Sequence, residues 1–313
     1  MRGRELLRRS PALEDVGSAC RDGDGNGASE RLQAQLRGRP RVRADRLERQ
    51  DDRPGDLALL VSRAQAVSAL RAERDGAVLR ITLARPETRN AFDAGLIAEL
   101  AEAFVDVGRA RAVILAGDGP SFSAGANVDW MRSSVDLSLE ENVADANALR
   151  KMLEAIDACP APVVARVQGH ALGGGAGLVA TSDIAVVARD AVFAFSEVKL
   201  GIIPAVISPF ALAKIGPSAA RRYFLTGERF DAHTALRIGL VHEVADDLDA
   251  AVDRVVGELL SAGPQAARWA KRLVRERPEG PETAHWIASR RTSDEGQEGL
   301  RAFLEKREPT WLE

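Results

Sequence analysis

Three consecutive glycines, Gly173–Gly175, and a fourth at Gly177 stand directly before an apolar, helix-like run. Glycine lets the backbone approach a ligand closely, and the first N–H groups of a helix have no partner inside the helix. The helix dipole adds partial positive charge at the same end. The motif predicts a site for an anion or for an oxygen that becomes negative during a reaction. Two other interpretations stay open for the motif alone: helix packing that only glycine permits, and dinucleotide binding, because GAGLVA (175–180) fits the pattern GxGxxA.

A second loop has the same character. The stretch GDGPSFSAGANVDWM (117–131) follows a short apolar run and is rich in small residues. If the two loops converge, their backbone N–H groups can hold one oxygen, as the enolate oxygen of a thioester requires, with donors about 3 Å away. Asn127 and Asp129 sit beside this loop, where a capping or turn role is favoured over contact with water. His170 has no identifiable carboxylate or serine partner and is expected to be packed or hydrogen-bonded.

The elements that must position these loops alternate between strand and helix. Residues 77–85 alternate apolar and polar side chains as a half-buried strand does, and 111–117 reads as a buried strand. Helices are predicted over 93–107, with Asp93 as N-cap, and over 138–158. Another strand precedes the glycines directly. This alternation predicts an α/β domain whose strand ends carry functional loops.

The chain divides into three segments by composition and by the pattern of its apolar residues. Residues 1–66 mix arginine, aspartate and glycine with little apolar content, so a disordered N-terminal extension is expected. Residues 67–260 form the predicted core, and 261–313 a helical C-terminal region.

The composition excludes several classes of function. The 313 residues are 45% hydrophobic, enough for a sizeable core, and a net charge of −3 gives no overall attraction to nucleic acid. The two cysteines, Cys20 and Cys159, build neither a disulfide framework nor a zinc motif, and no metal site is expected. No apolar run approaches the length of a membrane span, and the N-terminus lacks the apolar core of a signal peptide. We therefore expect a cytoplasmic protein that contacts no membrane.

Five ordered blocks, from about residue 72 to the C-terminus, resemble the enoyl-CoA hydratase/isomerase or crotonase superfamily. They are RPETRNAFD (85–93), FSAGANVDWM (122–131), VQGHALGGGAGLVATSDI (167–184), FAFSEVKLGIIPAVIS (193–208) and AARRYFLTGERFDAHTALRIGLVHEV (219–244). The resemblance implies a spiral of ββα units with a helical C-terminal region, assembled as a homotrimer or hexamer. It implies an acyl-CoA substrate, with coenzyme A as part of that substrate and no separate cofactor.

The resemblance also assigns roles to individual residues. The backbone N–H groups of Ala126 and Gly174 would form the oxyanion hole, with Gly125, Gly173 and Asp129 as further pocket residues. Family hydratases place one catalytic glutamate three residues after the second donor and another 20 residues later. Those positions are Gly177 and Glu197 in this chain, so the first acid is missing.

The missing acid leaves the reaction open between two enzymes. A single carboxylate suits a double-bond isomerase, which moves a proton between C2 and C4 on one face. The motifs around Glu197 and Gly177 instead resemble branched-chain hydratases of the methylglutaconyl-CoA and carboxygeranoyl-CoA type. We predict a hydratase in which Glu197 is the acid/base residue and the space freed at Gly177 accommodates a substrate branch or carboxylate that helps place the water. The isomerase is the alternative, and a non-catalytic acyl-CoA or RNA binder is the third.

The resemblance further places coenzyme A. Arg85 and the turn with Asn90 and Ala91 correspond to the region that receives the nucleotide, with Asn90 and Ala91 shaping the turn. Phe303 and Lys306 are candidates for contact with the 3′-phosphate region, often that of a neighbouring subunit. Ordinary helix packing and a solvated charge are the alternatives for these two residues.

Overall fold

The computed structural model describes residues 68–312. The expected extension 1–66 and Cys20 lie outside these residues. The described residues belong to one compact unit, Gln65–Glu313. None of the helices in this part of the chain is both long enough and apolar enough to span a bilayer.

The main sheet of the described chain has six strands in the order β1-β2-β3-β4-β6-β9. The strands are β1 Leu70–Asp75, β2 Val78–Leu83, β3 Ala112–Gly117, β4 Val163–Val167, β6 Ile184–Ala188 and β9 Glu243–Ala245. β1 and β2 form an antiparallel hairpin, and every later pair is parallel. The hairpin turns at Gly76, whose φ of +51° favours glycine. The parallel strands bring their carboxyl ends to one edge, where the two predicted loops begin.

A second, smaller sheet runs in the order β5-β7-β8, and the chain passes repeatedly between the two sheets. Its strands are β5 His170–Leu172, β7 Val192–Ala194 and β8 Phe230–Asp231. Strand β4 of the main sheet leads to β5 and then to helix α5, Gly174–Thr181. Strand β6 leads in the same way to β7, the short 3-10 helix η2 (Glu197–Leu200) and α6 (Ser208–Thr226). This succession is the expected spiral of ββα units, and the predicted α/β class is confirmed.

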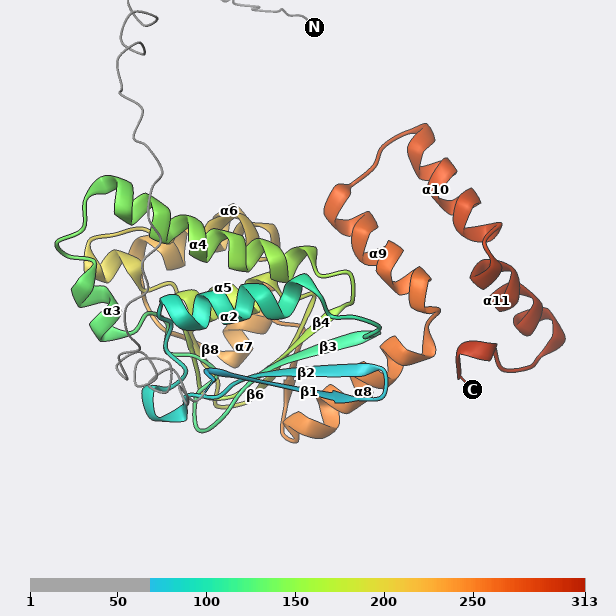
Figure 1. The fold of residues 1–313 in the computed structure, drawn as a ribbon, viewed down its shortest axis with the longest axis horizontal. Coiled ribbons are helices and arrows are strands. Elements are labelled where there is room, and N and C mark those ends of the chain that lie inside the picture. Colours follow the sequence, from blue (N-terminus) through green and yellow to red (C-terminus); the bar gives the residue numbers. More distant parts are fainter. Residues whose placement is uncertain (1–67, 313) are drawn as a thin grey trace, which may run out of the picture. The chain divides into compact units, whose positions relative to one another are not determined.

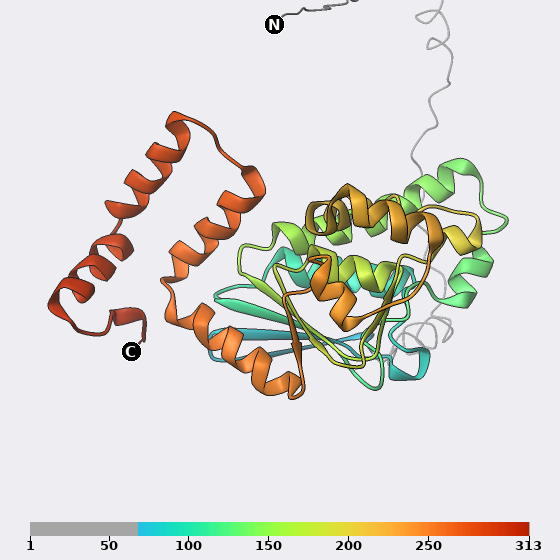
Figure 2. The same ribbon diagram turned by 180° about the vertical axis from the view of Figure 1, so that it is seen from behind.

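Helices cover both faces of the main sheet. Helices α2 (Ala94–Val105), α4 (Leu139–Ala158) and α5 lie over one face, and α8 (Leu248–Ser261) lies against the other (Figures 1 and 2). The residues of β3 alternate between two cores, because Val113 and Leu115 face the larger cluster while Ile114 packs with the side chains of α8.

Side-chain hydrogen bonds fix the N-termini of α2 and α4, the two helices that frame the site. The side chain of Asp93 accepts a hydrogen bond from the Leu96 N–H and caps α2, as predicted. Ser138 and Glu141 form a capping box at the start of α4.

The C-terminal region is helical, as expected. It comprises α9 Pro264–Glu276, α10 Pro281–Arg291, α11 Asp294–Glu305 and the 3-10 helix η3 Thr310–Leu312. The Arg111 guanidinium, at the start of β3, donates to the carbonyl oxygens of Leu260, Ala262 and Trp311. Lys271 of α9 forms a 2.7 Å ion pair with Asp183. These contacts tie the region to the sheet. Three short elements complete the described chain: η1 Pro86–Thr88, α3 Val128–Ser133 and α7 Ala232–Arg237.

Candidate active site

The two predicted loops run side by side. Ser123 and Ala171 form a parallel bridge, in which the Ser123 N–H donates to the His170 oxygen at 2.9 Å and the Leu172 N–H donates to the Ser123 oxygen at 3.0 Å. Ala126 and Gly174 each lie three residues after this bridge. Both line one cavity of about 340 Å³. The structure therefore brings the two candidate donors to one place.

Sterics explain the glycines of both loops. Gly173 and Gly125 have φ values of +50° and +88°, a conformation that favours glycine. A Cβ on Gly174 would collide with the ring of Phe92, and one on Gly175 would lie 2.6 Å from the Ser123 oxygen. The glycines therefore serve two purposes. Because they have no side chains, the two loops can pack closely, and the backbone N–H groups stay accessible to a ligand.

Both candidate amides are open to a ligand. Among residues 68–312, neither the Ala126 N–H nor the Gly174 N–H has a hydrogen-bond partner. Gly174 is the first residue of α5, where no partner exists inside the helix. Beside Ala126, the Phe92 N–H donates to the Gly125 oxygen and the Asn127 N–H to the Phe92 oxygen. In this ladder the Ala126 N–H points away from Phe92.

Glu197 places a carboxyl group in the same cavity. A Cβ built on Gly173 would lie 3.4 Å from its Oε1, so the carboxyl adjoins the glycines. Its Oε2 is buried without a hydrogen-bond partner within the described chain. Burial raises the pKa of the Glu197 carboxyl. A carboxyl with a raised pKa next to open backbone donors is suited to proton transfer at a carbon beside a thioester. Lys199, two residues on, is exposed.

The structure corrects the expectation of free space at Gly177. Gly177 is buried in α5 and does not line the cavity. A Cβ on it would lie 2.5 Å from Cγ2 of Ile207. The Ile207 side chain thus fills the volume that a longer residue at position 177 would need, and no pocket for a substrate branch opens there.

The structure also corrects the prediction that Asp129 is a pocket residue. It lies in the first turn of α3 (Val128–Ser133), exposed and paired with Arg132 at 2.5 Å, and it does not line the cavity. Asn127 caps this helix, because its Oδ1 accepts from the Asp129 N–H at 2.8 Å. The capping role favoured for Asn127 is confirmed. His170 Nδ1 lies 3.3 Å from Ser121 Oγ, so the histidine is hydrogen-bonded as expected, and its partner is a serine that the sequence did not identify.

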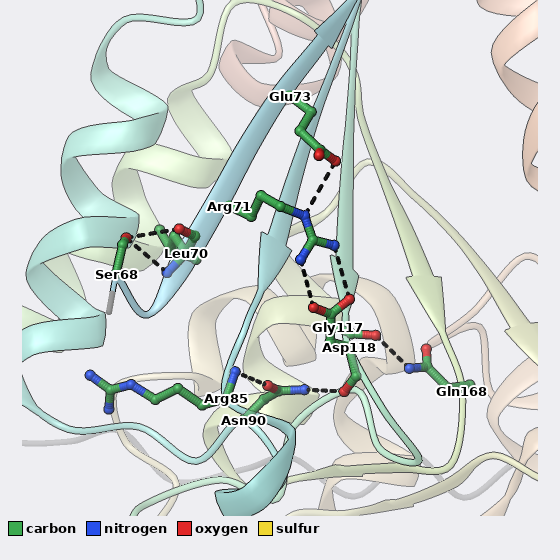
Figure 3. Close-up of polar contacts among 9 residues, drawn as sticks. All are labelled: Ser68, Leu70, Arg71, Glu73, Arg85, Asn90, Gly117, Asp118 and Gln168. Carbon is green, nitrogen blue, oxygen red and sulfur yellow. Dashed lines mark hydrogen bonds and ion pairs between the residues drawn. The ribbon is translucent and has the colours of Figure 1, made fainter. Parts of the chain in front are cut away.

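The turn expected to receive the nucleotide is organised by Asn90 (Figure 3). This side chain is fully buried, and its Nδ2 donates to the backbone oxygens of Asp118 and Ser121, both at 2.9 Å. Its Oδ1 accepts from the Arg85 N–H at 2.9 Å. The guanidinium of Arg85 is paired with Asp93. Asn90 therefore shapes the turn, as expected.

The other candidates for coenzyme A lie in the same turn and on α11. Ala91 is buried beside Asn90, Phe303 is 80% exposed on α11, and Lys306 caps the end of that helix in the left-handed conformation. None of these residues, nor Arg85, lines the cavity. Their contact with coenzyme A stays a prediction.

Sequence reasoning missed one face of α4. Asn142, Asp145, Ala146 and Leu149 line the cavity, and their spacing of three, four and seven residues puts them on one side of the helix. Burial raises the pKa of the Asp145 carboxyl, and the polar indole of Trp130 partly offsets that rise. This spacing was the available signal, but the sequence alone does not show which face of α4 meets a cavity.

The rest of the lining is largely apolar. It includes Met131, Leu200, Ile202, Ile203, Val206 and Ile207. Within the described part of the chain, no three histidine, cysteine, aspartate or glutamate side chains gather where they could hold a metal ion.

Comparisons with known proteins agree on one family. A family model described as enoyl-CoA hydratase/isomerase matches residues 73–313. The crystal structure of an enoyl-CoA hydratase from Shewanella pealeana is similar with a TM-score of 0.75 and 41% identity, over 81% of this chain and 98% of that one.

Two curated relatives carry related names. Enoyl-CoA hydratase ACTT6 of Alternaria alternata is 37% identical over 208 residues, 63% of this chain and 66% of the relative. The cyclohexa-1,5-dienecarbonyl-CoA hydratase of Thauera aromatica is 31% identical over 250 residues, 76% of this chain and 94% of the relative.

Proposed function

The chain belongs to the enoyl-CoA hydratase/isomerase family, and on that premise we propose that it adds water across the 2,3 double bond of an acyl-CoA thioester. One observation carries the proposal. The open N–H groups of Ala126 and Gly174 and the buried carboxyl of Glu197 line a single cavity. Coenzyme A enters as part of the substrate, and a homotrimer or hexamer in the cytoplasm remains part of the proposal.

In the proposed reaction the thioester oxygen accepts hydrogen bonds from the two amides. Ionised Glu197 takes a proton from water, the hydroxide oxygen bonds to C3, and the C2–C3 π electrons move to the thioester oxygen as an enolate. The enolate then collapses as Glu197 returns the proton to C2. The carboxylate is regenerated, and one water has been added. Removing one such backbone donor typically lowers the rate by a factor of about 10² to 10³.

A branched acyl group is the finer form of the proposal. Its support is the motif of residues 193–208 together with a cavity of about 340 Å³ whose walls are largely aliphatic. Because Ile207 occupies the volume beside Gly177, the water is placed by Glu197 and by the acyl group itself.

Isomerisation is the second candidate, and Ile207 is the observation that favours it. With this side chain beside Gly177, Glu197 is the carboxyl group adjacent to the two donors. It would take a proton from C2 of a 3-enoyl thioester, the amides would hold the resulting dienolate, and the same proton would return at C4. The product is a 2-enoyl thioester, and no water is consumed.

The test compares wild type with Glu197→Gln on crotonyl-CoA, 3-methylcrotonyl-CoA, 3-methylglutaconyl-CoA and 3-hexenoyl-CoA. We expect hydration by wild type and a fall in kcat/KM of about 10²- to 10⁴-fold in Glu197→Gln. Glu154→Gln is the matched control, because Glu154 lies on α4, half exposed and paired with Arg150.

Other results would point elsewhere. Hydration that survives Glu197→Gln removes Glu197 from the mechanism. Conversion of the 3-enoyl ester without water addition selects the isomerase. Binding of the esters with neither reaction selects the non-catalytic acyl-CoA binder.

A further inference from the structure

The part of the cavity lining that comes from α3, α4 and the residue after α3 includes three polar side chains that the proposed reaction does not use. Ser134 follows the last turn of α3, and Asn142 and Asp145 lie on the early turns of α4. In Figures 1 and 2, α3 lies next to the N-terminal part of α4. We call Ser134, Asn142 and Asp145 the acceptor wall, because of the bonds that two of them already make.

The hydrogens of Ser134 and Asn142 are already engaged in bonds to backbone oxygens. The Ser134 hydroxyl donates to the Met131 oxygen at 2.8 Å. The Asn142 amide donates to the oxygens of Leu137 and Ser138 at 3.1 and 3.0 Å, which uses both hydrogens of its NH₂ group. What these two side chains still offer is acceptor capacity, from Ser134 Oγ and Asn142 Oδ1.

Asp145 adds negative charge to the same wall. An ionised carboxylate has only acceptors. Its side chain is half-buried, and among the described lining residues there is no lysine, arginine or histidine to pair with it. The indole of Trp130 is the group that stabilises its ionised form. A second anion in this cavity would therefore meet like charge without a compensating cation.

We propose that the acceptor wall selects an acyl group carrying a hydrogen-bond donor, such as a hydroxyl, and rejects one that ends in a carboxylate. The inference rests on the proposed function, since it takes this cavity to be the acyl pocket. A donor on the ligand satisfies acceptors that an apolar chain would bury unpaired, and such sites discriminate strongly. Among branched substrates, the inference disfavours methylglutaconyl-CoA, whose free carboxylate would lie in a cavity lined by Asp145 and Glu197.

Binding of unreactive saturated thioesters tests the proposal. The ligands are hexanoyl-CoA, 6-hydroxyhexanoyl-CoA and adipoyl-CoA, which share a chain length and differ in the terminal group, with the matching four-carbon series as a second length. Calorimetry with the full chain should show 6-hydroxyhexanoyl-CoA binding at least about tenfold more tightly than adipoyl-CoA. Asp145→Asn should abolish most of this ratio while leaving the Kd of hexanoyl-CoA nearly unchanged. Glu154→Gln, which removes a negative charge elsewhere on α4, should leave the ratio intact.

Because these ligands do not react, the result is independent of turnover. If the protein does not hydrate crotonyl-CoA but keeps the ratio of binding affinities, the proposed function is contradicted and the acceptor wall is not. The proposed role of the acceptor wall is wrong if adipoyl-CoA binds as tightly as 6-hydroxyhexanoyl-CoA. It is also wrong if the ratio of their affinities is unchanged in Asp145→Asn. Ser134→Ala is the second variant should Asp145→Asn fold poorly, and it should weaken the preference for the hydroxyl over hexanoyl-CoA.

Discussion

The cavity has two walls, one formed by backbone N–H groups and the other by side-chain oxygens. On one side, the loop at Ala126 and the first turn of α5 at Gly174 present backbone N–H groups. On the other, α3 and α4 present the side-chain oxygens of the acceptor wall. Packing fixes the first wall, since a Cβ on Gly174 would strike Phe92. The second wall depends on which side chains stand on one face of α4.

This difference separates the reaction from the choice of substrate. Main-chain donors are the same for any residue except proline, so the proposed enolate chemistry survives most changes that leave the backbone in place. Side-chain acceptors can be exchanged without moving the backbone, so the acyl group can change while the reaction is kept. A substitution in one wall should therefore leave the property of the other wall nearly unaltered.

The largest expected effect comes from deleting a backbone donor. Gly174→Pro removes the N–H, and proline is well tolerated at the first position of a helix. Its Cβ would collide with Phe92, so the change is made in a Phe92→Ala background, where Gly174→Ala adds a Cβ and keeps the N–H. We expect the proline variant to hydrate crotonyl-CoA about 10² to 10³ times more slowly than the alanine variant, measured as kcat.

The same pair of variants checks the separation of the walls. Their ratio of affinities for 6-hydroxyhexanoyl-CoA and adipoyl-CoA should match, because Ser134, Asn142 and Asp145 are untouched. Equal rates for the two variants would show that the Gly174 N–H does not stabilise the enolate. A changed affinity ratio would show that the walls are not independent.

A smaller effect is expected where α5 meets Ile207. Gly177→Ala puts a methyl group 2.5 Å from Ile207 Cγ2, and overpacking of this kind costs about 1–3 kcal/mol of the free energy of unfolding. Ile207→Ala should relieve the clash, so the two substitutions together should destabilise the protein by less than their sum. Urea unfolding of the four proteins in this cycle measures the coupling. Additive effects would mean that the two side chains do not compete for one space.

The parts of the fold that were predictable carry local signals. The helix expected over 93–107 is observed as Ala94–Val105, because Asp93 caps it and its apolar residues recur with helical period. The helix expected over 138–158 is observed as Leu139–Ala158. Strand β1 was not recognised, since LRAERD is charged and exposed at the sheet edge. The strands of the second sheet have only two or three residues, too few for a period to show.

The residues of the site also divide into those that the sequence predicts and those that only tertiary packing reveals. The glycines and Glu197 could be placed because they stand in ordered motifs, and the structure brings Ala126, Gly174 and Glu197 to one cavity. The position of Ile207 against Gly177 arises from packing between α5 and the segment before α6, 30 residues apart in the chain. Asp145 faces the cavity because of how α4 is seated on α2 and α5. Such contacts depend on tertiary packing and leave no local pattern.

The smallest expected effect separates the two carboxyl groups of the cavity by pH. Burial raises the pKa of both Glu197 and Asp145, but only Glu197 adjoins the donors. The proposed reaction needs Glu197 ionised, so activity is retained above its pKa and lost as the pH falls through it, about tenfold per unit below that point. A raised pKa places this acid limb at a higher pH than an ordinary glutamate would. The kcat/KM profile for crotonyl-CoA should keep this limb in Asp145→Asn. A limb that shifts or disappears in that variant would assign the titration to Asp145 and place the chemistry partly on the acceptor wall.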